Sequence, residues 1–148
     1  MDRTFRGFTA GFIGAILMNI WSYFSFYILN FTDIRYVDWS SIMIFGYKAN
    51  SLAHLFIAQM SQLIWTGFLG VFVAFAFTLM TSRGFIFKGA LFGFMASFII
   101  YCVPALFKMN ALRNVTLGTA VTDIVGGIIW GVTTVIILKY LDSREVLY

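Results

Sequence analysis

Four long apolar stretches, separated by shorter polar segments, dominate the pattern of the chain. They cover about residues 5–29, 51–80, 85–107 and 116–140. A helix needs about 20 apolar residues to cross the hydrocarbon core of a bilayer, and each stretch reaches that length. The pattern therefore predicts an all-α fold, a four-transmembrane-helix bundle, as a single integral membrane domain over residues 1–148. An even number of spans places both termini on the same side of the membrane.

The connections between the predicted spans differ in length and character. Residues 81–84 form a tight turn, which predicts that the second and third spans are antiparallel neighbours. In the longer connection, Asp38 is a candidate helix cap, and Trp39, Ile42 and Met43 share one helical face. These residues predict a short amphipathic helix over about 38–46 that lies in the membrane interface.

Two similar glycine patterns suggest that the bundle consists of two duplicated helical hairpins. The first and third spans each carry a basic residue followed by Gly-x-x-x-Gly-Phe, and the fourth span has two further glycines on one face. Small residues four apart let two membrane helices approach closely, although membrane helices rich in Gly and Phe also produce such echoes by chance. Gly70 lies less clearly on such a face and is expected to tolerate alanine better. The predicted packing glycines are Gly7, Gly11, Gly89, Gly93, Gly127 and Gly131.

Composition supports lipid as the solvent of the predicted helices. The chain is 61% hydrophobic and only 11% charged, whereas a soluble domain has roughly 25% charged residues. The net charge is +4, but no basic run with interleaved aromatic residues is present, so nucleic acid is not an expected partner. Cys102 is the single cysteine and His54 the single histidine, so the sequence predicts no disulfide, no metal site and no cofactor.

Lysine and arginine residues set the predicted orientation. Six lie on the side of the termini and four on the other side, which favours cytoplasmic termini under the positive-inside rule. We therefore expect a multi-pass protein of a bacterial cytoplasmic (inner) membrane. The six are Arg3, Arg6, Arg83, Lys88, Lys139 and Arg144, and the four are Arg35, Lys48, Lys108 and Arg113.

One polar residue in each span lies in the half away from the termini. Asn19, Gln59, Ser97 and Asp123 are predicted to point inward at about 10–15 Å from the outer helix ends, and Asp123 is the only acid within any span. This buried polar layer either forms a site for a proton, a cation or a small polar ligand, or hydrogen-bonds internally and fixes helix register. His54 is a possible partner of Asp123, or an interfacial histidine in water.

Several short motifs resemble known families of small bacterial membrane proteins. Trp21-Ser22, the run from Leu29 to Ile34, and Arg113-Asn114 before the last span resemble the YqhR-like proteins of Gram-positive spore formers. The four-span plan, with a histidine early in the second span, is also similar to the YagU-like family. The chain departs from the pattern at residues 103–107, where the proline is placed differently. The resemblance implies an uncharacterised integral membrane protein and supplies no mechanism.

Two classes of function remain open at this point. The chain has no recognisable catalytic or phosphate-binding motif, which favours a non-enzymatic module that acts by helix–helix association, with lipid around it and either copies of itself or a larger membrane protein as partner. The alternative is a small proton-coupled, ion or small-solute permeation unit centred on the polar layer.

Overall fold

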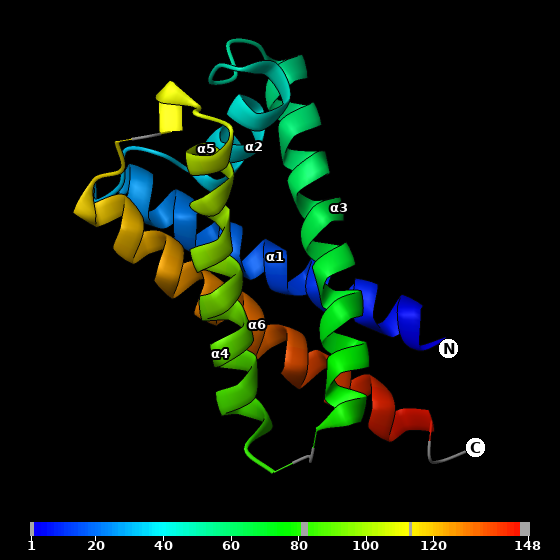
Figure 1. Ribbon diagram of the computed structural model, residues 1–148. Coiled ribbons are helices and arrows are strands. Elements are labelled where there is room, and N and C mark those ends of the chain that lie inside the picture. The colour runs from blue at the N-terminus through cyan, green and yellow to red at the C-terminus, as the bar shows by residue number, and fades with distance from the viewer. Residues whose placement is uncertain (1, 81–82, 113, 146–148) are drawn as a thin grey trace.

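All regular secondary structure in the described part of the chain is helical. The computed structural model describes residues 2–80, 83–112 and 114–145, and contains no strand within them. Figure 1 shows the arrangement of these helices. The elements are α1 (Arg3–Tyr27), α2 (Tyr36–Phe45), α3 (Leu52–Ala76) with the 3₁₀ turn η1 (Phe77–Leu79), α4 (Phe85–Ile100), α5 (Cys102–Leu106), η2 (Asn110–Leu112) and α6 (Leu117–Glu145).

Four helical segments are long and apolar enough to cross a membrane. They are Arg3–Tyr27, Leu52–Leu79, Phe85–Leu106 and Leu117–Ser143. These segments confirm the predicted all-α, four-helix fold, and their bounds lie within a few residues of those expected from hydropathy. The fold and composition thus define a multi-pass membrane protein. Both ends of the described chain lie at the same end of the bundle as the start of α4 (Figure 1).

Close approach at glycine residues joins α1 to α3. Gly7 and Gly11 of α1 face Gly70 of α3. A Cβ atom added to Gly11 would lie only 2.6 Å from the carbonyl oxygen of Thr66, so the backbones are in direct contact. Gly70 therefore lies at the centre of this contact, contrary to the expectation that it would lie at its edge.

The second helix pair, α4 with α6, repeats this arrangement. Gly89 and Gly93 of α4 face Gly127 and Gly131 of α6. A Cβ atom added to Gly89 would lie 2.8 Å from the carbonyl oxygen of Gly131. The two pairs meet where α1 packs against α6, and Trp130 of α6 donates a hydrogen bond from its indole nitrogen to the carbonyl oxygen of Gly11 at 3.0 Å.

The contacts of α3 and α4 differ from the sequence prediction. Although they follow one another in the chain, α3 packs mainly on α1 and α4 mainly on α6, and the two share no extensive interface. One contact between them joins Phe77, just after α3, to Phe92 of α4, whose ring centres lie 6.0 Å apart. The two spans run antiparallel beside each other, as the short turn predicts, but they do not pack closely, because the glycine faces of both helices are in contact with other partners (Figure 1). Thr81 and Ser82 of the predicted turn lie outside the described residues.

The helix α2 forms close to the predicted place, but its start and environment differ from expectation. Arg35 is the N-cap, and Asp38 lies in the first turn, where its carboxylate accepts hydrogen bonds from the backbone nitrogen and side chain of Arg35 at 2.8–2.9 Å. Trp39 and Ile42 are buried in a cluster with Leu112. Two of the three residues of the predicted apolar face are therefore covered by protein, whereas the third, Met43, is 37% exposed.

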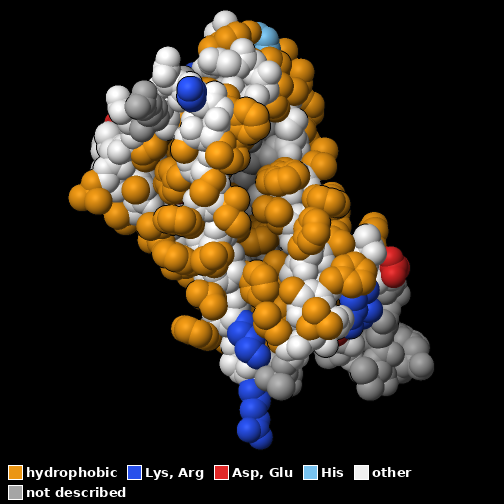
Figure 2. Space-filling view, viewed as in Figure 1, with side chains coloured by type: hydrophobic (Ala, Val, Ile, Leu, Met, Phe, Trp, Pro, Cys, Tyr) orange, Lys and Arg blue, Asp and Glu red, His pale blue; other side chains and the backbone are white. Residues whose placement is uncertain are grey.

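The outer surface is apolar over most of its height. Figure 2 shows hydrophobic side chains spread over the face formed by α3 and α4, with Lys and Arg side chains toward its lower and upper ends. Large side chains such as Ile20, Trp65 and Phe98, each about 60% exposed, contribute to this surface. An exposed apolar surface of this kind is stable in lipid, and in water it would be an extended patch.

Candidate functional site

The polar residues predicted to form one layer lie in two separate clusters. The first cluster links α1 to α3. The side-chain nitrogen of Asn19 donates to Gln62 Oε1 at 2.8 Å, and Gln59 Nε2 donates to Asn19 Oδ1 at 3.3 Å and to Gln62 Oε1 at 3.2 Å. The hydroxyl of Tyr23 completes it by donating to Gln59 Oε1 at 2.9 Å. Asn19 and Gln59 therefore meet directly, as the sequence suggests, and both also donate to Gln62, which the sequence did not single out.

The second cluster surrounds Asp123 on α6. Its side chain is fully buried, and its Oδ2 atom accepts a hydrogen bond from the hydroxyl of Tyr101 at 2.7 Å. The backbone carbonyl oxygen of Asp123 accepts from the hydroxyls of Ser97 at 2.9 Å and Tyr36 at 2.7 Å. Ser97 and Asp123 are thus brought together, but through the backbone of α6 rather than through the carboxylate.

Trp39 of α2 lies next to the carboxylate of Asp123. The indole nitrogen of Trp39 and the Oδ1 atom of Asp123 are both buried without a hydrogen-bond partner among the described residues. Because one atom is a donor and the other an acceptor in the same neighbourhood, a small shift of α2 would let them satisfy each other. We therefore regard both atoms as members of the second cluster, which fixes α2 against α4 and α6.

The structure places His54 away from Asp123. His54 Nδ1 lies 2.6 Å from the side-chain oxygen of Asn50, in the first turn of α3, and its ring packs against Phe45 and Tyr47. This region is exposed at the end of the bundle opposite the termini, which fits the interfacial alternative for the histidine. Tyr101, which the sequence did not single out, occupies the partner position beside the carboxylate.

A cavity of about 600 Å³ lies between α3 and α4, where the two helices fail to pack. Residues exposed on the outer surface, among them Trp65, Phe72 and Ile99, form its rim. Its deeper part reaches Gln62 and Trp130. The cavity is therefore accessible from the side, which in a membrane is the side of the lipid chains.

Few polar residues lie at the bottom of this cavity, and most of them already form hydrogen bonds within the protein. The hydroxyl of Thr66 donates to the carbonyl oxygen of Gln62 at 2.8 Å, and that of Ser97 donates to the backbone of α6. Two lining residues carry a buried donor without a hydrogen-bond partner among the described residues, the indole nitrogen of Trp39 and the Nε2 atom of Gln62. The indole nitrogen of Trp39 lies beside the Asp123 carboxylate, whereas Gln62, whose side chain is only 6% exposed, has no unused acceptor assigned to its Nε2 atom. No charged residue is among the described residues that line the cavity.

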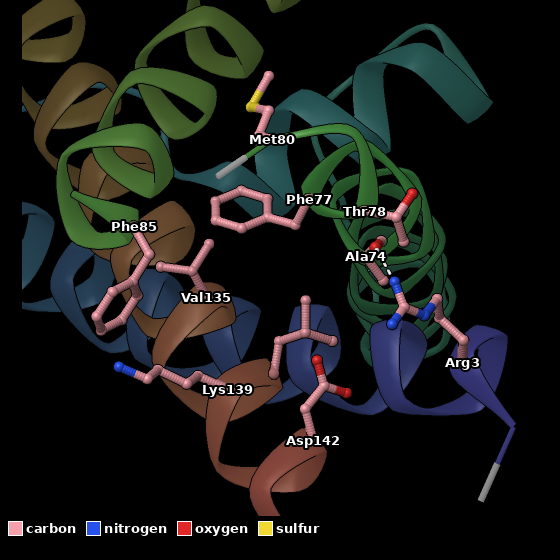
Figure 3. A pocket seen from close by; sticks show the side chains of 10 residues that line it. Arg3, Ala74, Phe77, Thr78, Met80, Phe85, Val135, Lys139 and Asp142 are labelled. Carbon is pink, nitrogen blue, oxygen red and sulfur yellow. Dashed lines mark hydrogen bonds between the residues drawn. The ribbon is translucent and has the colours of Figure 1, made fainter. Parts of the chain in front are cut away.

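A second cavity, of about 350 Å³, lies at the end of the bundle that carries the termini (Figure 3). Its charged residues already have partners. Arg3 donates to the carbonyl oxygen of Ala74 at 3.4 Å, Asp142 pairs with Arg6 at 2.8 Å, and the Lys139 ammonium lies 4.1 Å from the centre of the Phe85 ring. These contacts join the ends of α1, α3, α4 and α6.

The buried face of α3 also has a signal in the sequence. The sequence prediction placed Gln59 on the inward face of this helix. The face that is buried instead carries a small or polar residue at every fourth position. Such steps are the same signal that identified the glycine faces of the other spans. The residues at these steps are Ala58, Gln62, Thr66, Gly70 and Ala74, and all of them are buried.

Comparisons of the chain with protein-family models, with curated proteins and with solved structures find no match. The resemblance to the YqhR-like and YagU-like families therefore stays a prediction from the sequence. Within the described residues, no group of three or more His, Cys, Asp or Glu side chains could hold a metal ion. The class of protein is given by the fold: a four-span helical membrane protein with a lateral cavity.

Proposed function

We propose that this chain is a non-enzymatic membrane module that receives an apolar partner from the bilayer into the cavity between α3 and α4. The single observation that carries the proposal is the lateral cavity itself. Its volume of about 600 Å³ lies within the range of about 300–1,000 Å³ typical of ligand sites, and its rim consists of side chains exposed to lipid. A partner already dissolved in the bilayer can enter without crossing water.

The packing of the other helices supports a binding role. Glycine contacts fix α1 to α3 and α4 to α6, and the bond from Trp130 to Gly11 fixes the two pairs to each other. The walls of the cavity therefore belong to two rigid pairs, and the opening is part of the packed fold. A largely preformed site needs little reorganisation when a partner binds.

The alternative function, permeation of protons, ions or small polar solutes, has less support. The polar groups of both clusters bond mainly to one another or to backbone, and the cavity that reaches the middle of the bundle has no charged residue in its described lining. An ion in such a cavity would lose its hydration without gaining equivalent ligands. The polar layer is better explained as a device that fixes helix register.

The proposal includes a location. We place the chain in a bacterial cytoplasmic membrane with both termini in the cytoplasm, on the basis of the excess of lysine and arginine on that side and the family resemblance. Assembly with further copies of the chain or with a larger membrane protein remains part of this proposal, because large apolar side chains cover much of the outer surface.

Photolabelling in reconstituted membranes tests the binding role. A long-chain alkane that carries a diazirine should label residues inside the cavity, such as Leu69, Val73 and Phe92, more strongly than exposed apolar residues elsewhere on the surface. The variant Ala96→Trp fills the cavity with a bulky ring and should remove this excess. Ala53→Trp makes the same exchange at an exposed site outside the cavity and should preserve it. Labelling that is equal over all lipid-facing helices would refute the proposal.

A further inference from the structure

The amide group of Gln62 has a defined orientation. Its Oε1 atom accepts two hydrogen bonds, from Asn19 Nδ2 at 2.8 Å and from Gln59 Nε2 at 3.2 Å. Exchanging the oxygen and nitrogen of Gln62 would bring its NH₂ group against two other N–H donors, which is unfavourable. The orientation of Asn19 is fixed in turn, because its Nδ2 atom also donates to the carbonyl oxygen of Ala15 at 2.8 Å and a carbonyl oxygen can only accept. The atom of this cluster that lacks a hydrogen-bond partner is therefore the donor nitrogen Nε2 of Gln62.

This nitrogen is a buried donor in a residue that lines the cavity. It has no acceptor among the described residues, and the side chain of Gln62 is only 6% exposed. Buried donors in folded proteins nearly always have an acceptor, since an unsatisfied one is unfavourable by the full cost of its desolvation. The Nε2 atom is itself covered by protein, so an acceptor supplied by a molecule in the cavity would remove that cost once the amide turns toward the cavity.

The remainder of the lining specifies what kind of molecule carries the acceptor. The described lining residues include no charged side chain to pair with a phosphate or an ionised carboxylate, so the molecule is neutral. From Gln62 to Phe72 the cavity follows α3 for about 15 Å, at 1.5 Å per residue, between largely apolar side chains. Gln62 itself lies about 15 Å from the outer end of α3, close to the middle of a bilayer core about 30 Å thick.

We infer that the cavity holds a neutral, single-chain lipid-like molecule whose carbonyl oxygen accepts a hydrogen bond from the amide nitrogen of Gln62. This inference rests on the proposed function and names the chemical class of its partner. The carbonyl group lies near mid-membrane and the hydrocarbon chain follows α3 toward Phe72. A phospholipid does not fit, because its charged headgroup and ester groups remain at the membrane surface, about 15 Å from Gln62.

Two probes distinguish the inference from the proposed function. The first is a long-chain fatty acid methyl ester with a diazirine on its chain, and the second is the alkane of the same length with the same diazirine. In membranes that contain the full chain, the ester should label the cavity residues about fivefold more than the alkane, as expected for one buried hydrogen bond. Peptide mapping by mass spectrometry gives the labelled positions and their ratios.

The variant Gln62→Met removes the donor and should abolish the preference for the ester while labelling by the alkane persists. Asn19 and Gln59 keep other acceptors in this variant, since Asn19 Nδ2 also donates to the carbonyl oxygen of Ala15 and Gln59 Nε2 to Asn19 Oδ1. The matched control is Gln59→Met, which makes the same exchange in the same cluster at a residue that does not line the cavity. This control should keep the fivefold preference.

The possible outcomes separate the two claims. Equal labelling of the cavity by ester and alkane in the unmodified chain would overturn the inference and leave the proposed function standing. The same conclusion follows if Gln59→Met and Gln62→Met lose the preference equally. Absence of cavity labelling by either probe would refute both claims. Cross-links from cavity residues to a second copy of the chain, in place of probe adducts, would show that the occupant is protein and would overturn the inference.

Discussion

The indole nitrogen of Trp130 lies 3.0 Å from the carbonyl oxygen of Gly11, and this hydrogen bond joins the two glycine-packed helix pairs. Trp130 is 3% exposed and belongs to the main buried cluster with Ala15 and Met18. The pairs α1–α3 and α4–α6 thus share a polar anchor inside an apolar core. Because α3 and α4 do not pack on each other, this anchor and the α1–α6 contact hold the two pairs in register.

Trp130→Phe should lower the free energy of unfolding by about 0.6–1 kcal/mol, because it removes this bond and keeps an aromatic ring. Thermal unfolding in a mild detergent measures the change. Trp65→Phe is the matched control, since Trp65 is 60% exposed and should leave stability unchanged. Equal stability of the two variants would mean that the bond to Gly11 contributes nothing to holding the pairs together.

Gly70→Ala should destabilise the fold by about 1–3 kcal/mol, the usual cost of overpacking. An added Cβ atom would meet the backbone of Gly11 at 2.6 Å, and a helix backbone can move only if the whole helix moves. Gly67→Ala is the control, because its Cβ atom would meet the ring of Phe8 at 2.8 Å, and a side chain can rotate away. The unfolding temperatures of both variants in detergent decide the matter, and a larger loss for Gly67→Ala would contradict the prediction.

Asp123→Asn should fold with only a small loss of stability, since its side-chain oxygen can still accept the hydrogen bond of Tyr101, while its NH₂ group replaces the oxygen beside the Trp39 indole nitrogen. Asp123→Leu should cost about 1–3 kcal/mol, because it leaves that hydroxyl without its acceptor. Adding Tyr101→Phe to the leucine variant removes the stranded hydroxyl and should recover part of the loss. These three variants, compared by thermal unfolding, measure the coupling between the two residues. Full stability of Asp123→Leu alone would show that the cluster does not hold α6 in place.

Proteoliposomes that contain the chain should show no proton or potassium flux above that of empty liposomes at any pH between 5 and 8. The reason is that the described lining of the larger cavity lacks charged groups, and both polar clusters are engaged in internal hydrogen bonds. A pH-sensitive dye inside the vesicles measures proton entry. Flux that disappears in Asp123→Asn would instead establish the permeation function centred on Asp123.

The orientation can be read from single cysteines in a Cys102→Ala background, which removes the one exposed native thiol. With cytoplasmic termini, Ser143→Cys should be protected from an impermeant maleimide on intact cells, and Asn110→Cys should be labelled. Both positions are exposed, so accessibility of the site itself does not limit the reaction. The reverse pattern of labelling would invert the proposed orientation and leave the fold unaffected.

The sequence by itself determined the number, approximate bounds and helical nature of the spans. This was possible because hydrophobicity and length are local properties, and a chain in lipid must satisfy its backbone hydrogen bonds within each span. The glycines of the first and third spans are also visible in the sequence, because small residues at four-residue steps lie on one face of any helix. The buried positions of Asn19 and Asp123 follow from the same helical geometry.

Only the tertiary structure decided which faces meet. The rotation of α3 that buries Gln62 and Gly70, and leaves Gln59 at the edge, depends on the contact with α1, which is distant in sequence. The separation of α3 from α4 follows because each of these two helices uses its small-residue face on another partner. The cavity and the unpaired amide of Gln62 arise from these competing contacts, so no local pattern of residues could have predicted them.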